Sequence, residues 1–309
     1  AEDDLDTLFK KVETAVWIGV IQSCFTDFPY LNDKWKENCE EERLLGVSLT
    51  GIMDNKTLLS ADALRAMKRK AIKIAKHASE LLGVSMPAAI TCVKPSGTVS
   101  QLVDSSSGIH TRYASYYRRR YRISATDPLF RMLQDQKVPM SPETGQRKED
   151  WAKAEGGDAE ACAIYKEGKS WSADDVITWV VSFPVKSPDG SVLRGDMTAM
   201  EQLEQYKKIQ ENWCEHNASC TVYVKDNEWF EVGNWVYKNW DIINGVSFLP
   251  YDGGRYEQAP YEECTEEEYN KMLANLPEID YRYLSMYETE DTTEGAKTWA
   301  CTGDRCELT

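Results

Sequence analysis

Hydroxyl side chains and a glycine follow a short apolar run in the first third of the chain. Residues 90–93 are mostly β-branched, which is typical of a buried strand. Pro95 ends this run, because proline cannot donate a hydrogen bond to a neighbouring strand. The bend that follows carries hydroxyl and backbone N–H groups on Ser96, Gly97, Thr98 and Ser100. A bend of this kind, leading toward a helix, can bind a phosphate group, although the same residue types also form ordinary turns.

Two cysteines near the end of the sequence form a second candidate site. Cys301 and Cys306 are separated by four residues that include a glycine, so a disulfide between them is sterically available. From residue 288 onward Glu, Asp, Thr and Gly dominate, and we expect this tail to be mobile. No histidine lies nearby, so a metal site is not predicted. The alternatives are a redox carrier and two surface thiols, and the spacing favours the carrier.

Two further clusters have chemical potential but favour a structural interpretation. Residues 38–41 place a thiol beside carboxylates, and a charged helix edge explains them better than acid–base chemistry. Residues 113–122 interleave tyrosines with arginines, a pattern that can stack bases and bind phosphates. The same pattern also fits a strand whose arginines face water or form ion pairs.

Composition limits the possible partners and locations. The net charge of −15 argues against nucleic acid as the main partner, because nucleic-acid-binding proteins carry basic faces. No apolar run approaches the roughly 18 residues that a membrane span needs. The nine cysteines are scattered and no signal peptide is recognisable, so we expect a reducing, cytoplasmic environment. The length allows one large or two modest domains.

Hydrophobic periodicity predicts an α/β fold. Apolar residues recur at helical spacing from residue 5 to 20, and residues 44–53 have the composition of a buried strand. A long helix is predicted over residues 60–82, with Ser60 as its N-cap and Gly83 ending it. Its predicted apolar stripe consists of Leu64, Met67, Ala71, Ile74, Ala78 and Leu81. The strand at 90–93 follows, which gives the strand–helix–strand unit of an α/β fold.

The second half of the chain continues this alternation after a charged, glycine-rich excursion over residues 137–172. Strands are predicted at 176–185, 219–224 and 246–250, and helices at 198–214 and 229–240.

Several motifs in the same order resemble those of one family, the monomeric, adenosylcobalamin-dependent (class II) ribonucleoside-triphosphate reductases. The matching segments are residues 42–52, 93–99, 108–110, 127–129, 219–221, 249–251, 253–254 and 258–260, followed by the two tail cysteines. Residues 133–178 carry no matching motif.

The resemblance implies that residues 1–287 form the C-terminal half of a ten-stranded α/β barrel and that residues 288–309 form a mobile redox tail. The substrate-phosphate loop would consist of Pro95, Ser96, Gly97, Thr98 and Val99. A side chain at Gly97 is expected to crowd this loop and block a phosphate from its backbone. Cys301 and Cys306 would re-reduce a barrel disulfide by thiol exchange. Adenosylcobalamin would generate the cysteine radical that attacks the ribose, and a thioredoxin-type protein would supply electrons.

One departure from the family pattern is important. The family's radical cysteine lies in an Asn-Pro-Cys-Gly-Glu motif, which does not occur in this sequence. We therefore expect the chain to be the C-terminal part of a split, intron-interrupted or incomplete reductase, and to be inactive alone. A half barrel would expose strand edges, so the expected protein partner is an N-terminal reductase fragment.

Two alternatives remain open from the sequence. The chain could belong to the large subunit of an iron-dependent reductase, for which the adjacent tyrosines Tyr116 and Tyr117 are the only hint. It could also be a stand-alone phosphate-binding or thiol-carrier module.

Overall fold

The computed structural model describes residues 3–55, 57–97, 99–251 and 257–288, together with the backbone of 299–302 and 305–308. The chain divides into two compact units. Unit 1 comprises Ala1–Tyr117 and Lys186–Arg255, and unit 2 comprises Arg118–Val185 and Tyr256–Thr309. None of the described helices combines the length and apolar character needed to cross a membrane.

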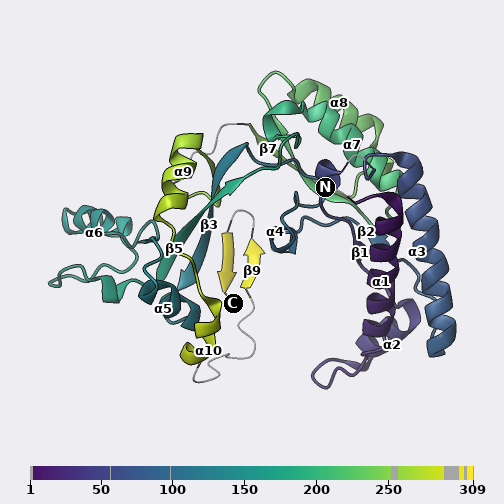
Figure 1. Ribbon diagram of the computed structural model, residues 1–309, viewed down its shortest axis with the longest axis horizontal. Coiled ribbons are helices and arrows are strands. Elements are labelled where there is room, and N and C mark those ends of the chain that lie inside the picture. The colour runs from purple at the N-terminus through teal and green to yellow at the C-terminus, as the bar shows by residue number, and fades with distance from the viewer. Residues whose placement is uncertain are drawn as a thin grey trace. The chain divides into compact units, whose positions relative to one another are not determined.

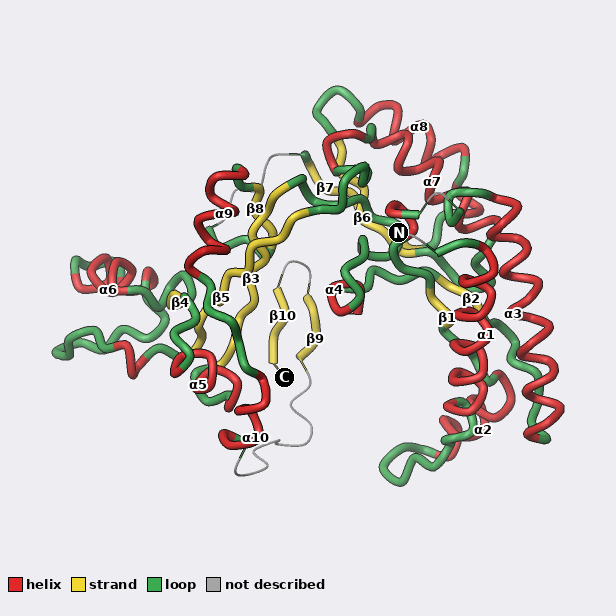
Figure 2. The backbone as a smooth tube through the Cα atoms, viewed as in Figure 1, coloured by secondary structure: helices red, strands yellow, loops and turns green. Residues whose placement is uncertain are grey.

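Unit 1 alternates strands and helices along the chain (Figures 1 and 2). Its helices are α1 (Leu5–Gln22), α2 (Asp33–Glu42), α3 (Ala61–Leu82), α4 (Val99–Leu102), α7 (Ala199–Asn212) and α8 (Trp229–Lys238). Its strands are β1 (Val47–Ser48), β2 (Thr91–Cys92), β6 (Ser219–Val224) and β7 (Gly245–Pro250). Strands β1 and β2 pair in parallel, as do β6 and β7, and a parallel bridge between Val93 and Ala218 joins the two pairs. The strand order is therefore β1-β2-β6-β7. Strands of unit 1 that follow one another along the chain thus also lie side by side.

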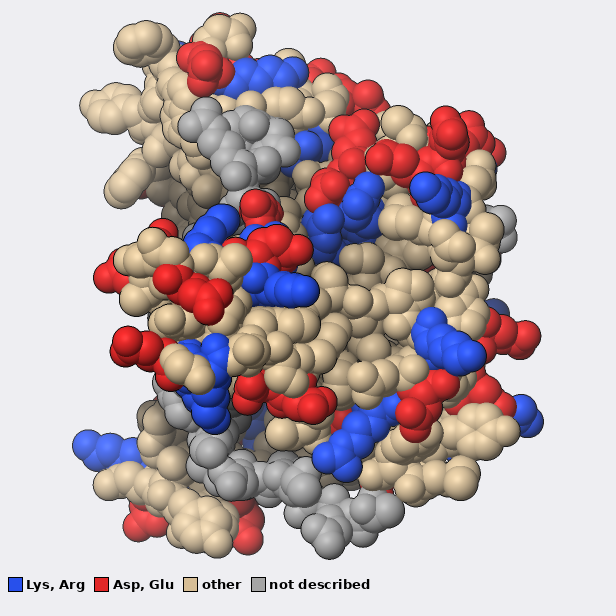
Figure 3. Space-filling model, turned by 90° about the vertical axis from the view of Figure 1, so that its left-hand side faces the viewer, with Lys and Arg blue, Asp and Glu red and all other residues tan. Residues whose placement is uncertain are grey.

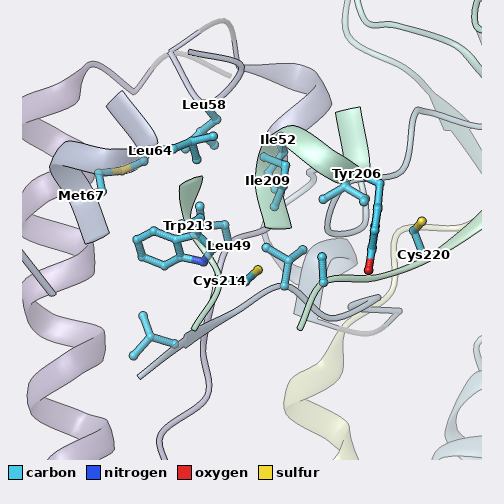
Figure 4. Packing of buried hydrophobic residues seen from close by; sticks show 14 of the residues in the cluster. Leu49, Ile52, Leu58, Leu64, Met67, Tyr206, Ile209, Trp213, Cys214 and Cys220 are labelled. Carbon is cyan, nitrogen blue, oxygen red and sulfur yellow. The ribbon is translucent and has the colours of Figure 1, made fainter. Parts of the chain in front are cut away.

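A hydrophobic core packs four of these helices against the strands. The core contains one face each of α1, α3, α7 and α8 and the buried side chains of the strands. Figure 4 shows Leu64 and Met67 of α3 near Trp213, which follows α7, with Ile209 and Tyr206 beside them. The indole N–H of Trp213 donates to the carbonyl of Cys92 at 2.8 Å, so this buried side chain also fixes the end of β2. Strand β6 alternates, with Cys220, Val222 and Val224 buried, so its other side chains lie on the face opposite this core.

Unit 2 is built on a four-stranded sheet of order β4-β5-β3-β8. The strands are β3 (Tyr116–Ser124), β4 (Met140–Pro142), β5 (Thr178–Lys186) and β8 (Tyr261–Glu263). The helices are α5 (Pro128–Asp135), α6 (Lys148–Glu155), α9 (Glu266–Asn275) and α10 (Leu284–Tyr287). Two short strands, β9 (Trp299–Thr302) and β10 (Arg305–Leu308), pair antiparallel.

The arginine-rich segment is the salt-bridged strand that the sequence offered as one alternative. On β3, Arg118 and Arg120 pair with Glu262, and Arg122 pairs with Glu143. On the face shown in Figure 3, basic and acidic side chains of the described residues alternate. The arginines therefore pair with carboxylates of their own unit.

Helix α3 confirms most of its prediction and corrects one detail. Ser60 accepts the N–H of Ala63, and Gly83 adopts the left-handed conformation (φ 67°) that ends the helix, as predicted. However, Leu81, which was predicted to be buried, is 65% exposed. Ala75, which was not part of the predicted stripe, is buried. Strand β1 is also shorter than the predicted 44–53, because Gly51 turns left-handed at φ 70° and begins a 3₁₀ turn at Ile52–Asp54.

Candidate phosphate-binding loop and cysteine pair

The Pro-Ser-Gly loop directly follows β2, at the carboxyl end of a parallel strand. The Ser96 hydroxyl accepts the N–H of Ser100 at 3.1 Å, and the Ser100 hydroxyl donates back to the Ser96 carbonyl. The Ser96 hydroxyl also lies 3.4 Å from that of Thr50, which follows β1. Pro95 and Gly97 are exposed, Val99 begins α4 with its side chain exposed, and Thr98 lies outside the described residues. The loop is thus anchored at its ends and open in its middle.

Gly97 has open space around it. A Cβ atom built on this residue would meet no atom within 4 Å beyond its chain neighbours, and its φ is not left-handed. The expectation that a side chain would crowd the bend itself is therefore wrong. A side chain at Gly97 would instead fill the open space beside its backbone.

Lys94 provides a cation at the start of this loop. Its backbone N–H donates to the Ser48 hydroxyl at 3.0 Å, which ties the loop to β1. Its ammonium group donates to Asn217 Oδ1 at 2.9 Å and to Ser219 Oγ at 3.0 Å, while the residue stays exposed. In a chain with a net charge of −15, this is the kind of local donor that could attract an anion.

A second loop, which carries the Gly-Ile-His motif, supports the first. Gly108 has φ 57°, and a Cβ atom here would lie 2.7 Å from the carbonyl oxygen of Lys94. The Thr50 hydroxyl accepts the N–H of Gly108 at 3.1 Å and donates to the carbonyl of Ser106 at 3.0 Å. Glycine is therefore required at 108 both for its conformation and for this close approach of two backbones.

A buried ion pair fixes the second loop. Arg112 and Asp54 are almost fully buried, and their charged groups meet at 3.0–3.2 Å. Asp54 also accepts the N–H of Ser106 at 2.6 Å, and Arg112 donates to the carbonyl of Asp104 at 2.7 Å. Burial pulls the pKa of Arg112 down, but the hydrogen bond and charge of Asp54 outweigh it, so this pKa is raised.

His110 connects the same loop to β6 through a defined tautomer. Its Nδ1 lies 2.9 Å from the carbonyl oxygen of Ser107, so Nδ1 carries the proton, and its Nε2 accepts the N–H of Thr221 at 2.9 Å. Burial lowers the pKa of His110, an effect that the Ser107 hydrogen bond only partly offsets. The ring is therefore neutral near pH 7, and protonation would turn the Thr221 hydrogen bond into a contact between two donors.

Sequence reasoning missed a third group, in which Arg194 is surrounded by tyrosines. Its guanidinium carbon lies 4.1 Å from the ring centroid of Tyr113, 4.9 Å from that of Tyr251 and 5.3 Å from that of Tyr223. These residues come from four separate segments of unit 1, near the carboxyl ends of β6 and β7. Cation–π contacts of this kind fix the ends of these strands. The sequence did not predict this cluster, because its tyrosines lie far apart along the chain.

Three cysteines of unit 1 lie in its interior. Cys92, Cys214 and Cys220 are buried, and burial raises the pKa of each, to about 12 for Cys214 and Cys220. Thiols of this kind stay protonated and unreactive near neutral pH. Cys39 lies within α2, as predicted for a charged helix edge. Within the described ranges, no group of three or more metal-binding side chains occurs.

The tail cysteines occupy opposite positions in the β9–β10 pair. The antiparallel register sets Cys301 opposite Cys306. Directly opposed Cα atoms in such a pair lie about 4.5–5.5 Å apart, and disulfides need about 4.4–6.8 Å. The backbone register is therefore compatible with a disulfide. The predicted boundary at residue 288 and the mobility of the tail stay predictions, since residues 289–298 lie outside the described residues.

Comparison with known structures identifies the fold. A crystal structure described as a B-12 dependent (class II) ribonucleotide reductase superimposes with a TM-score of 0.68 at 22% identity, covering 90% of this chain and 40% of that chain. The predicted α/β class is thus confirmed.

Sequence comparison identifies the relatives. The adenosylcobalamin-dependent ribonucleoside-triphosphate reductase of Euglena gracilis is 28% identical over 281 residues, or 88% of this chain and 35% of that protein. The enzyme of the same name from Lactobacillus delbrueckii subsp. bulgaricus is 29% identical over 239 residues, or 73% of this chain and 28% of that protein. No protein-family model matches the chain. The resemblance inferred from the motifs is confirmed, and the chain spans about a third of the length of these relatives.

The buried ion pair leads to a stability prediction. Arg112→Leu should lower the free energy of unfolding by about 3–5 kcal/mol, because it leaves the Asp54 carboxylate buried without a counter-charge. Arg65→Leu is the matched control: its partner Asp62 is exposed, so the loss should be about 1 kcal/mol or less. Urea unfolding followed by circular dichroism measures both values. Equal midpoints for the two variants would show that the Arg112 pair does not hold the fold.

His110 leads to a prediction about pH. Because its folded pKa is lowered, its contribution to stability is complete above the unfolded pKa of about 6.5 and is lost as pH falls below that value. The loss should reach at most about 1.4 kcal/mol per pH unit. His110→Gln should flatten the decline of unfolding free energy between pH 7.5 and 5.5, whereas His77→Gln, at an exposed position, should leave it unchanged. A wild-type decline that survives His110→Gln would contradict the assignment.

Proposed function

We propose that this chain is the C-terminal portion of a ribonucleoside-triphosphate reductase, which converts ribonucleotides to 2′-deoxyribonucleotides. The observation that carries the proposal is the open loop from Lys94 to Gly97 in a fold like that of a class II reductase. The four parallel strands of unit 1 would form part of one half of a ten-stranded barrel. An N-terminal portion would supply the remaining strands and the radical cysteine.

In this proposal the loop holds the substrate's phosphates. The exposed backbone of Gly97 and the hydroxyl of Ser96 would donate hydrogen bonds to phosphate oxygens, and the Lys94 ammonium group would add a positive charge. Thr98 and Val99 complete the proposed loop by sequence. Because Gly108 contacts the Lys94 carbonyl so closely, the loop would be preorganised before the substrate arrives.

Cys301 and Cys306 would act as the reductant shuttle. One tail thiolate would attack the barrel disulfide and form a mixed disulfide, and the second thiolate would then release the barrel as a dithiol. Two electrons pass to the barrel, and the tail is left as a disulfide for a thioredoxin-type protein to reduce. The opposed register of the two cysteines supports this role, because the oxidised tail needs a short disulfide ring.

Adenosylcobalamin, which the names of the relatives give as their cofactor, would initiate the radical when bound. The Asn-Pro-Cys-Gly-Glu motif, which in the resembled family carries the cysteine on which it acts, does not occur in this sequence. We also propose a cytoplasmic location, where thiols stay reduced.

Of the two alternative functions, the stand-alone module remains to be tested. The class II likeness favours a cobalamin enzyme over an iron-dependent one.

The loop assignment predicts the effect of Gly97→Val. In the enzyme assembled with its N-terminal portion, binding of a ribonucleoside triphosphate should weaken by about ten- to a hundredfold, because the side chain blocks charge-assisted hydrogen bonds to the backbone. The melting temperature should change little, since the Cβ position is open. Isothermal titration calorimetry and thermal unfolding measure the two effects. Gly233→Ala, which fills open space on α8, is the control, and unchanged affinity in Gly97→Val would refute the assignment.

The shuttle predicts a split between first and later turnovers. Cys301→Ser/Cys306→Ser should leave the single-turnover burst of deoxynucleotide in pre-reduced, assembled enzyme, because the barrel dithiol is already present. Steady turnover with thioredoxin should collapse, and dithiothreitol should restore much of it by reaching the barrel directly. Unaltered thioredoxin turnover would rule out the shuttle, and loss of the burst would indicate a direct catalytic role. Cys24→Ser/Cys39→Ser, at two thiols outside the tail, is the control.

A further inference from the structure

The ammonium group of Lys94 is held by two neutral side chains. It donates to Asn217 Oδ1 at 2.9 Å and to Ser219 Oγ at 3.0 Å. In the part of the chain that the structure describes, no carboxylate lies within ion-pair distance of it. A carboxylate partner would cancel most of the lysine's charge, whereas an amide and a hydroxyl fix its position and leave the charge available.

The two neutral side chains also orient each other. Asn217 Nδ2 donates to Ser219 Oγ at 3.3 Å, so the amide turns its oxygen toward Lys94. Ser219 Oγ therefore accepts two hydrogen bonds, and its own proton points away from both donors. That hydroxyl group can donate to a further acceptor, such as a phosphate oxygen. The three side chains thus present hydrogen-bond donors together with one positive charge.

Backbone pairing places this group on the open face of the sheet. The N–H of Val93 donates to the carbonyl of Asn217 at 3.2 Å, and the N–H of Ser219 donates to the carbonyl of Val93 at 2.8 Å. Val93 and Ala218 form a parallel bridge, and both are buried in the core of unit 1. Because side chains alternate along a strand, Lys94 and Ser219 share the face opposite this core. Lys94 is exposed there, so a ligand can reach it.

A glycine on the neighbouring strand leaves room for the group. Gly245 of β7 lies beside Ser219 in the parallel register. A Cβ atom built on Gly245 would lie 2.8 Å from Ser219 Oγ and 3.0 Å from Asn217 Nδ2. The φ of Gly245 is not left-handed, so its conformation does not require glycine. The absence of a side chain therefore serves the two residues that hold Lys94.

We propose that Asn217 and Ser219 are positioning residues that present the charge of Lys94 to the substrate, and that this charge makes affinity increase with the number of phosphates. The inference rests on the proposed function, since it assumes that the adjacent loop binds phosphate. The attraction of one positive charge for a ligand grows with the ligand's negative charge. Lys94 therefore favours a ribonucleoside triphosphate over the diphosphate and the monophosphate, which neutral N–H and O–H donors distinguish less.

Asn217→Asp tests the charge while keeping the lysine. The new carboxylate has nearly the same shape and would pair with the Lys94 ammonium group. Titration calorimetry on the full chain, without Mg²⁺ and at constant ionic strength, gives dissociation constants for cytidine mono-, di- and triphosphate. We expect the triphosphate constant to rise about tenfold and the monophosphate constant about threefold, because the triphosphate carries roughly twice the charge. The melting temperature should not fall, since an ion pair replaces a neutral contact.

Asn212→Asp is the matched control for net charge. Asn212 lies at the end of α7, where its side chain accepts a hydrogen bond from Arg65. This variant adds the same charge beside another cation and should leave all three dissociation constants unchanged. Equal changes for the three nucleotides in Asn217→Asp, or an equal effect of Asn212→Asp, would overturn the inference but not the loop assignment. If the wild-type chain binds none of the nucleotides, the loop assignment and the inference both fail.

A double-mutant cycle tests whether Asn217 acts through the lysine. Asn217→Ala should weaken triphosphate binding by about threefold when Lys94 is present, because the ammonium group loses one of its two acceptors. In a Lys94→Met background the same substitution should have no effect, since no charge is left to position. A loss that persists in Lys94→Met/Asn217→Ala would show that Asn217 contacts the ligand itself, and the positioning role would be wrong.

Discussion

The buried pair of Arg112 and Asp54 is the interaction on which the candidate site depends. Asp54 ends a short 3₁₀ turn and Arg112 forms a single parallel bridge with Leu193, so few backbone hydrogen bonds hold the segments that the pair joins. Asp54 fixes the N–H of Ser106, and Arg112 fixes the carbonyl of Asp104. Removing two charges from water is costly, and the pair is stable only when both partners keep their geometry. This requirement gives the loop one conformation, and through Gly108 it also positions the carbonyl of Lys94.

Local signals allowed much of the fold to be predicted from the sequence. Ser60 and Gly83 bound α3 because capping depends on residues adjacent in the chain, and residues 219–224 form β6 because their alternation matches the strand period. Leu81 was misplaced because its exposure depends on where the neighbouring elements end, which helical spacing does not encode. The partnership of Arg112 with Asp54 spans 58 positions, and no pattern within either segment indicates it. The candidate phosphate-binding loop could be predicted from its residue types, whereas the ion pair of Arg112 and Asp54 that helps to position it could not.

The buried cysteines of unit 1 illustrate how environment determines chemistry. Burial keeps the thiols of Cys214 and Cys220 protonated, so they serve as small apolar side chains in the core of unit 1. A thiol that exchanges electrons must instead reach other proteins and ionise readily. The sequence places Cys301 and Cys306 near its end, in a segment rich in acidic and small residues. Composition and spacing therefore indicate Cys301 and Cys306 as candidate redox cysteines before any geometry is known.

The path of the chain out of unit 1 has an evolutionary consequence. The chain leaves this unit at Tyr117 and returns at Lys186, and there the N–H of Ser187 donates to the carbonyl of Ser115 at 2.9 Å. The strands that carry it out and back, β3 and β5, are neighbours in one sheet. When departure and return lie side by side, the segment between them can lengthen, shorten or diverge at little entropic cost to the rest. Residues 133–178, the stretch without a matching family motif, lie within this excursion, where a change of length or sequence would leave the fold of unit 1 in place.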